Sequence, residues 1–133
     1  MGFFKRLFGL PVTRTPADDS SWKVVDGKTV ELTLDRLPAL AEPGGAVRLE
    51  GQGLEPRLLV LHGIDGVFRA FKNNCACSGW RIDPVDGEEK VRCCTLAQST
   101  YDYDGKRIAG PAQKDLETFA VEQDGGTLVI RLS

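Results

Sequence analysis

The stretch LLVLHGIDGVFRAF, residues 58–71, gives the strongest indication of how this chain folds. Two runs rich in apolar, β-branched and aromatic residues, 58–64 and 67–71, flank the dipeptide Asp65-Gly66. Asp-Gly between two such runs favours a tight turn joining antiparallel strands. We therefore predict a β-hairpin in the middle of the chain.

Short strand-like runs separated by turn residues continue on both sides of this hairpin. Residues 29–34 alternate with a period of two after the turn Asp26-Gly27. Further strands are predicted at residues 24–25, 46–50, 89–94, 100–103, 106–108, 118–122 and 127–132. No helix of ten or more residues and no internal repeat is evident in the sequence. Strands at this spacing predict an all-β fold, either an antiparallel sandwich or a small barrel.

The bulk composition is typical of one soluble globular domain. The chain has 133 residues, of which 41% are hydrophobic and 27% charged, and its net charge is −2. This charge gives no broad basic face for nucleic acid. No apolar run approaches the roughly 18 residues of a membrane span. We expect a domain at residues 22–133 that binds no nucleic acid and has no transmembrane segment.

Residues 1–21 differ from the rest and are predicted to be an N-terminal tail and linker. Within residues 3–10, Phe4, Leu7 and Phe8 share one face of a short amphipathic helix, with two basic residues beside them. Two interpretations stay open: a helix that makes a weak interfacial or partner contact, or a tail that packs on its own domain. The basic residues interrupt the apolar run, unlike those of a secretory signal, so the expected location is cytoplasmic.

All four cysteines fall within twenty residues, as Cys75-Ala-Cys77 and the adjacent pair Cys93-Cys94. Each pair brings two sulfur atoms close along the chain, so two loops that meet once would gather four thiols. Four thiolates are the ligand set of a tetrahedral zinc site or of an iron–sulfur cluster. The residues alone therefore predict metal binding and leave the metal open.

The order of these parts resembles the Rieske iron–sulfur domain family over roughly residues 22–132. The first cluster loop of that family reads Cys-x-His-x-Gly, which residues 75–79 (CACSG) match with cysteine in place of histidine. The second loop reads Cys-Pro-x-His before an aromatic-Asp pair, a frame that residues 94–97 (CTLA) and Tyr101-Asp102 fit. The resemblance implies a Rieske-like antiparallel sandwich or small barrel with a two-loop cluster-binding subdomain.

The histidine ligands of that family are not kept in this chain. An ordinary Rieske centre places two thiolates on one iron and two imidazoles on the other. The single histidine, His62, lies in neither loop and is expected to be a packed or edge-strand residue, while Ala97 stands at a histidine position. The resemblance also puts Ser99 and Tyr101 where the family has hydrogen-bond donors to cluster sulfur.

We therefore expect a [2Fe–2S] cluster held by cysteines alone. The resemblance puts Cys75 and Cys94 on one iron, and Cys77 with Cys93 would bind the other. Neighbouring residues of an extended strand point to opposite faces, so the chain should kink at Cys93-Cys94. Thiolates in place of neutral imidazoles add negative charge. This lowers the reduction potential toward the value of about −400 mV typical of plant-type clusters.

The expected function is that of a ferredoxin-type electron carrier for a separate redox partner protein, a reductase or an oxygenase. No catalytic triad, phosphate loop or dinucleotide fingerprint is present, so the chain alone is not expected to be an enzyme. Two alternatives stay open. One is a structural Cys₄ zinc site. The other is a cluster-free accessory or interaction module with free or disulfide-bonded cysteines, for which the Rieske frame implies a Cys75–Cys94 pair.

Two polar segments beside the loops are expected to face solvent. Residues 72–74 (KNN) precede the first cysteine and are predicted to form a solvated turn. The acidic residues Asp83, Asp86, Glu88 and Glu89 connect the two loops and are predicted to form a solvated face.

Overall fold

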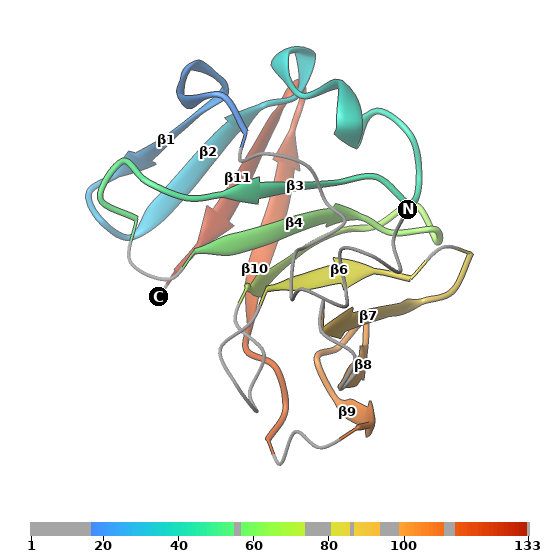
Figure 1. Ribbon diagram of the computed structural model, residues 1–133. Helices are drawn as coiled ribbons and strands as arrows, with labels where there is room; N and C mark the ends of the chain where they lie inside the picture. The colour runs from blue at the N-terminus through green and yellow to red at the C-terminus, as the bar shows by residue number, and fades with distance from the viewer. Residues whose placement is uncertain are drawn as a thin grey trace.

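The computed structural model describes residues 17–54, 57–73, 81–85, 87–93, 99–110 and 114–132. Antiparallel strands dominate it (Figure 1). The strands are β1 (Trp22–Val25), β2 (Thr29–Thr33), β3 (Ala46–Leu49), β4 (Leu58–His62), β5 (Phe68–Lys72), β6 (Ile82–Pro84), β7 (Lys90–Cys93), β8 (Thr100–Asp102), β9 (Arg107–Ala109), β10 (Thr118–Asp124) and β11 (Thr127–Arg131). The predicted all-β class is confirmed.

The strands form two sheets. The larger has seven strands in the order β1-β2-β11-β10-β5-β4-β3, and the smaller has four in the order β6-β7-β8-β9. The helices within the described parts are three 3-10 turns, η1 (Asp19–Ser21), η2 (Leu34–Arg36) and η3 (Pro38–Leu40). None of these turns is long and apolar enough to cross a membrane.

The hairpin turns lie where the Asp-Gly dipeptides predict them. Asp26 and Gly27, between β1 and β2, have positive φ angles of 54° and 66°, the left-handed backbone that tight hairpins use. Gly66 between β4 and β5 (φ 84°) and Gly125 between β10 and β11 (φ 61°) do the same. The central hairpin is therefore confirmed, with His62 paired to Phe68 at its closed end.

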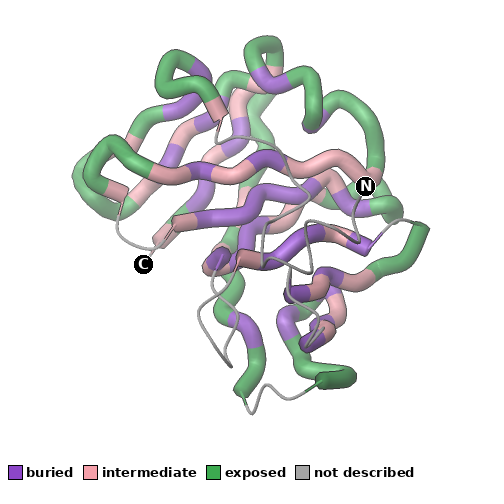
Figure 2. The backbone as a smooth tube through the Cα atoms, viewed as in Figure 1, coloured by how far each residue is buried: buried purple, intermediate pink, exposed green. Residues whose placement is uncertain are grey.

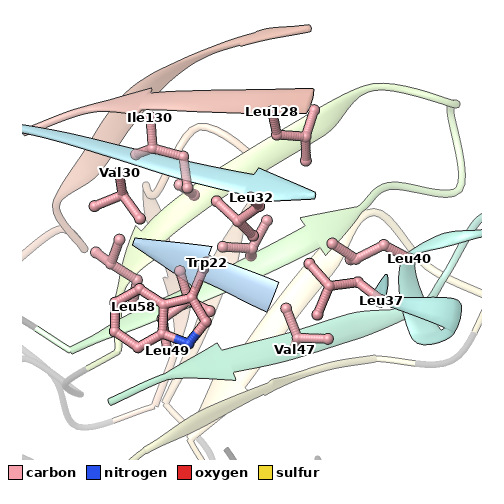
Figure 3. Packing of buried hydrophobic residues seen from close by; sticks show 12 residues of the cluster. Trp22, Val30, Leu32, Leu37, Leu40, Val47, Leu49, Leu58, Leu128 and Ile130 are labelled. Carbon is pink, nitrogen blue, oxygen red and sulfur yellow. The ribbon is translucent and has the colours of Figure 1, made fainter. Parts of the chain in front are cut away.

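The first hydrophobic cluster lies inside the curl of the seven-stranded sheet (Figure 3). Both edges of the sheet contribute to it, Trp22 from β1 and Val47 from β3. Because the two edges meet in one cluster, the sheet curls into a half-barrel. Its buried members are Trp22, Val30, Leu32, Leu37, Leu40, Val47, Leu49, Leu58, Val60, Ala70, Leu128 and Ile130.

Strand β4 is buried on both faces and separates two hydrophobic clusters. Leu58 and Val60 belong to the first cluster, whereas Leu59 and Leu61 point the other way into a second cluster. Successive strand residues face opposite sides, which explains why an uninterrupted apolar run occurs here. In Figure 2, buried residues accordingly concentrate on the central strands and exposed residues at the hairpin turns.

The second cluster joins the smaller sheet to the back of the β4–β5 hairpin. Its buried members are Leu59, Leu61, Phe71, Ile82, Val91, Cys93, Tyr101, Tyr103 and Leu116. They come from both sheets, so the smaller sheet has no separate core of its own among the described residues. Its position depends on this shared contact.

One expectation about the chain outside the central hairpin needs correction. Strand β6 was not predicted, and Asp83 within it is 2% exposed, so it is not part of a solvated acidic face. Asp83 is buried because β6 pairs with β7 and sets it opposite Arg92. Ala17 packs on the first cluster, and its backbone N–H donates to Arg48 O (2.8 Å), so contacts with the domain extend before residue 22. The amphipathic segment 3–10 lies outside the described residues.

Candidate metal centre

The first cysteine loop ends, and the second begins, at neighbouring points of the smaller sheet. Strand β6 starts at Ile82, shortly after the first loop. Strand β7 ends at Cys93, and the second loop continues from there. Ile82 and Cys93 are direct partners in the antiparallel register. The Cys93 N–H donates to the Ser99 carbonyl (2.8 Å) and closes the base of the second loop. The ends of both loops therefore meet.

Asn73 closes the base of the first loop from the other side. Its Oδ1 accepts a hydrogen bond from the Ile82 N–H at 2.7 Å. Its backbone is fixed by Arg57, because Asn73 N donates to Arg57 O (2.9 Å) and Arg57 Nε donates to Asn73 O (2.7 Å). Asn73 is fully buried, so the solvated turn predicted for residues 72–74 is wrong at this residue. The sequence gives no sign of this contact, because its partner is nine residues away.

An ion pair anchors the end of the first loop to the larger sheet. Arg81 donates two hydrogen bonds to the Glu50 carboxylate, from Nε at 2.7 Å and from Nη2 at 2.9 Å. Arg48 Nε lies 3.4 Å from the same carboxylate. The hydrogen bonds from Arg81, helped by the charge of Arg48, hold the pKa of Glu50 below its usual value. The carboxylate therefore stays charged and keeps the loop end in place.

Tyr103, in the β8–β9 turn, forms a third link between the sheets. Its hydroxyl accepts from Ile64 N (3.2 Å) and donates to Glu88 O (3.4 Å). The Arg69 guanidinium lies 4.5 Å from the centre of the ring. Arg69 also donates two hydrogen bonds of 2.8 Å to Asp65, which hold the pKa of Asp65 at about 2. The tip of the central hairpin is thereby tied to the smaller sheet.

Of the four predicted ligands, Cys93 lies within the described residues. It is the last residue of β7, fully buried in the second cluster, and keeps its ladder pairing with Ile82. A kink at Cys93-Cys94 would therefore have to follow Cys93. Cys75, Cys77 and Cys94 lie outside the described residues, as does Ala97. In the described ranges, no three His, Cys, Asp or Glu side chains gather as a metal site.

The other residues singled out from the sequence have clear positions. His62 Nδ1 donates to the Leu40 carbonyl (2.8 Å), and its ring stacks on Phe68 with centroids 4.3 Å apart. Of the two expected positions, packed or on an edge strand, His62 takes the packed one, because β4 lies between β3 and β5. Ser99 and Tyr101 are both fully buried at the far end of the second loop.

The residues present fit a sulfur-ligated centre in two respects. First, the two loops whose ends meet contain four thiols and no other strong metal ligand of the Rieske type. Second, the Asn73 side-chain amide has a buried Nδ2 that finds no hydrogen-bond partner within the part of the chain that the structure describes. A buried donor of this kind costs about 1–3 kcal/mol when it is left unsatisfied. A sulfur acceptor beside the loop ends would satisfy it.

Comparison with solved structures identifies the fold. The ferredoxin of carbazole 1,9a-dioxygenase from Nocardioides aromaticivorans IC177 superposes with a TM-score of 0.61 at 21% identity, covering 76% of this chain and 93% of the ferredoxin. The plasma membrane Rieske protein PetC3 from Synechocystis PCC 6803 gives 0.53 at 24% identity, covering 63% of this chain and 85% of that protein.

A larger enzyme shares the same architecture in one part of its chain. The quaternary ammonium Rieske monooxygenase CntA gives a TM-score of 0.58 at 19% identity over 85% of this chain, which spans 32% of the enzyme. No protein-family model matches the sequence, and no curated protein matches it. The chain therefore has a Rieske-like fold, as the resemblance implied.

Proposed function

We propose that this protein is a small one-electron carrier whose Rieske-like fold holds a [2Fe–2S] cluster through Cys75, Cys77, Cys93 and Cys94. The observation that carries the proposal is the pairing of Ile82 with Cys93, which joins the ends of the two cysteine loops. When bound, the cluster supplies reversible one-electron chemistry. The protein contributes the thiolates, the anchored loop ends and the apolar cluster behind them.

Ligation by sulfur alone distinguishes this proposal from an ordinary Rieske centre. With one histidine in the chain, and that one hydrogen-bonded to Leu40, two imidazole ligands are not available. Four thiolates favour the oxidised state, so the potential should lie below the Rieske range of about −150 to +300 mV. Without imidazole N–H groups at the iron, the potential should not change with pH near neutrality.

A separate reductase or oxygenase is the proposed redox partner. The similar ferredoxin belongs to a dioxygenase, and the similar monooxygenase has this fold as a part of its chain. The likeness to a ferredoxin supports the proposal that this chain delivers electrons to another protein. We propose that this takes place in the cytoplasm, where the four thiols would stay reduced and available for iron.

Metal and sulfide analysis after anaerobic purification tests the proposal. We expect about two iron atoms and about two acid-labile sulfides per chain and a brown colour. Cys75→Ser, which removes one thiolate and keeps the size of the side chain, should lose both iron and sulfide. Ser78→Ala in the same loop is the matched control and should keep both. Stoichiometric zinc without sulfide would contradict the cluster and support the structural Cys₄ zinc site instead.

A cluster-free accessory module is the second candidate, and the burial of Cys93 favours it. Cys93 lies in an apolar cluster, an environment that also suits cysteine as a small core residue. For this candidate the protein would be colourless and metal-free, and Cys93→Ala would change only its stability. For the electron carrier, the same substitution removes a ligand and with it the cluster.

A further inference from the structure

Asn73 is a fully buried polar residue beside the loops, and its hydrogen bonding is incomplete within the described residues. Its side chain is 0% exposed. Three of its four polar groups are used: the backbone N–H and carbonyl by Arg57, and Oδ1 by the Ile82 N–H. The remaining group, Nδ2, is buried, and no described residue accepts a hydrogen bond from it. It is a donor held in place beside the loop ends.

The orientation of this amide is fixed by its partner. The group facing Oδ1 is a backbone N–H, which can only donate. Turning the amide over would set two donors against each other at 2.7 Å and leave Oδ1 unpaired. The amide therefore keeps this orientation, and Nδ2 needs a separate hydrogen-bond acceptor.

The position of Asn73 indicates which acceptor that is. It stands two residues before Cys75, and the residue that it binds, Ile82, is the strand partner of Cys93. The side-chain amide thus lies where the first loop, β6 and the end of β7 come together. Thiolate and sulfide sulfur accept N–H hydrogen bonds, and such bonds tune the potential of iron–sulfur centres.

We propose that Asn73 Nδ2 donates a hydrogen bond to a sulfur of the centre, an inference that rests on the electron-carrier function proposed above. The bond is stronger when the centre holds an additional electron, because the sulfur is then more negative. Asn73 therefore stabilises the reduced state and raises the potential. It partly offsets the lowering caused by four thiolates.

The chain offers a matched control, because its only asparagines are the neighbours Asn73 and Asn74. Asn73→Asp keeps an oxygen to accept from Ile82 but removes the N–H donor. Asn74→Asp adds the same charge one residue away. We expect Asn73→Asp to lower the potential by about 59 mV more than Asn74→Asp does, which is a tenfold change in the ratio of reduced to oxidised protein. Equal shifts would overturn the inference.

Electron spin-echo spectroscopy of the reduced protein gives a readout that a purely structural role would not change. The protein is labelled with ¹⁵N only at the side-chain amides of asparagine. We expect a ¹⁵N coupling to the reduced cluster in the wild type and in Asn74→Asp, and its loss in Asn73→Asp. If Asn73→Asp does not fold, the other two proteins still decide the result.

The outcomes separate this inference from the function on which it rests. Wild-type protein that carries the cluster but shows no ¹⁵N coupling overturns the role of Asn73 and leaves the electron carrier intact. Wild-type protein that shows no iron–sulfur signal at all, after purification with iron and sulfide, overturns both. A coupling that persists in Asn73→Asp and disappears in Asn74→Asp would mean that Asn74 is the donor. This result also overturns the inference.

Discussion

The two sheets of this molecule are stabilised in different ways. The seven-stranded sheet has strands of four to seven residues and encloses an almost entirely aliphatic cluster. In the four-stranded sheet, three strands have only three residues, and β9 is exposed throughout. Polar links through Asn73, Glu50 and Tyr103 connect it to the larger sheet. Such short strands are marginal without additional contacts.

This difference assigns a separate task to each sheet. The larger sheet provides the stability of the domain, because most of the buried aliphatic side chains belong to it. The smaller sheet provides the place where the two loops meet, and its polar links determine where their ends lie. The region of the candidate centre should therefore open more easily than the half-barrel that supports it.

Removing the centre should have the largest effect, and only on the smaller sheet. In Cys75→Ser we expect complete loss of iron and faster amide exchange in β6, β7 and β8, because the loops no longer share a centre. Amides of β2, β10 and β11 should exchange at the wild-type rate. Hydrogen exchange read by mass spectrometry measures both sets, and equal acceleration in both sheets would contradict the division of tasks.

Adjacent residues of β4 allow the two sides of that strand to be compared directly. Leu58 faces the first cluster and Leu59 the second, and both are fully buried. Leu58→Ala should lower the free energy of global unfolding by about 2–5 kcal/mol and leave iron bound. Leu59→Ala should mainly remove packing between the two sheets, in the second cluster, and so weaken the support of the candidate centre.

Denaturant titration and iron analysis of the two variants check this prediction. We expect Leu59→Ala to lose iron during gel filtration while Leu58→Ala keeps it. The same iron retention in both variants would mean that the second cluster does not support the centre.

The ion pair behind the first loop should make a smaller contribution. Glu50→Gln keeps the shape of the side chain but removes the charge that Arg81 binds, and should cost about 1–2 kcal/mol. Glu122→Gln removes an exposed pair with Arg131 from the larger sheet and is the control. Its effect on urea denaturation should not be measurable. An equal loss in both variants would contradict the anchoring role of Glu50.

Acid should weaken the ion pairs of Asp65 and Glu50. This is the smallest of the effects expected here. The pKa of Asp65 is lowered from its usual 3.8 to about 2, and that of Glu50 is lowered from 4.5. In this pH range the unfolded chain therefore binds more protons than the folded one. Both groups stabilise the fold fully above their usual pKa values, and this contribution is lost as the pH falls through their lowered values. The stability difference between wild type and Asp65→Asn should vanish near pH 2. A stability difference that grows on acidification would contradict the stabilising role of the charged Asp65.

Much of the larger sheet could be predicted from local sequence. The dipeptides Asp26-Gly27 and Asp65-Gly66 predict the turns at which they lie. The uninterrupted apolar run in residues 58–61 is typical of a strand buried on both faces. Strand β6 could not be found in this way. It has three residues, ends in proline and contains Asp83, so it shows no alternation. Its existence depends on pairing with β7.

The ligands of the candidate centre stay a prediction, because Cys75, Cys77 and Cys94 lie outside the described residues, and its surroundings were only partly predictable. Four clustered cysteines and the spacing of the landmarks identify the two loops. Asn73 was expected in solvent because polar residues before a loop usually face it, and only the fold shows the contact to Ile82. Long-range contacts of this kind leave no local pattern in the sequence.

Iron K-edge X-ray absorption of the anaerobically purified protein tests the central claim most directly, because it reports the atoms bound to the metal. Our account predicts a first shell of sulfur alone and a second iron nearby, in the wild type and in His62→Ala alike. Nitrogen in the first shell, or iron atoms without an iron neighbour, would contradict a cluster shared by the two cysteine loops.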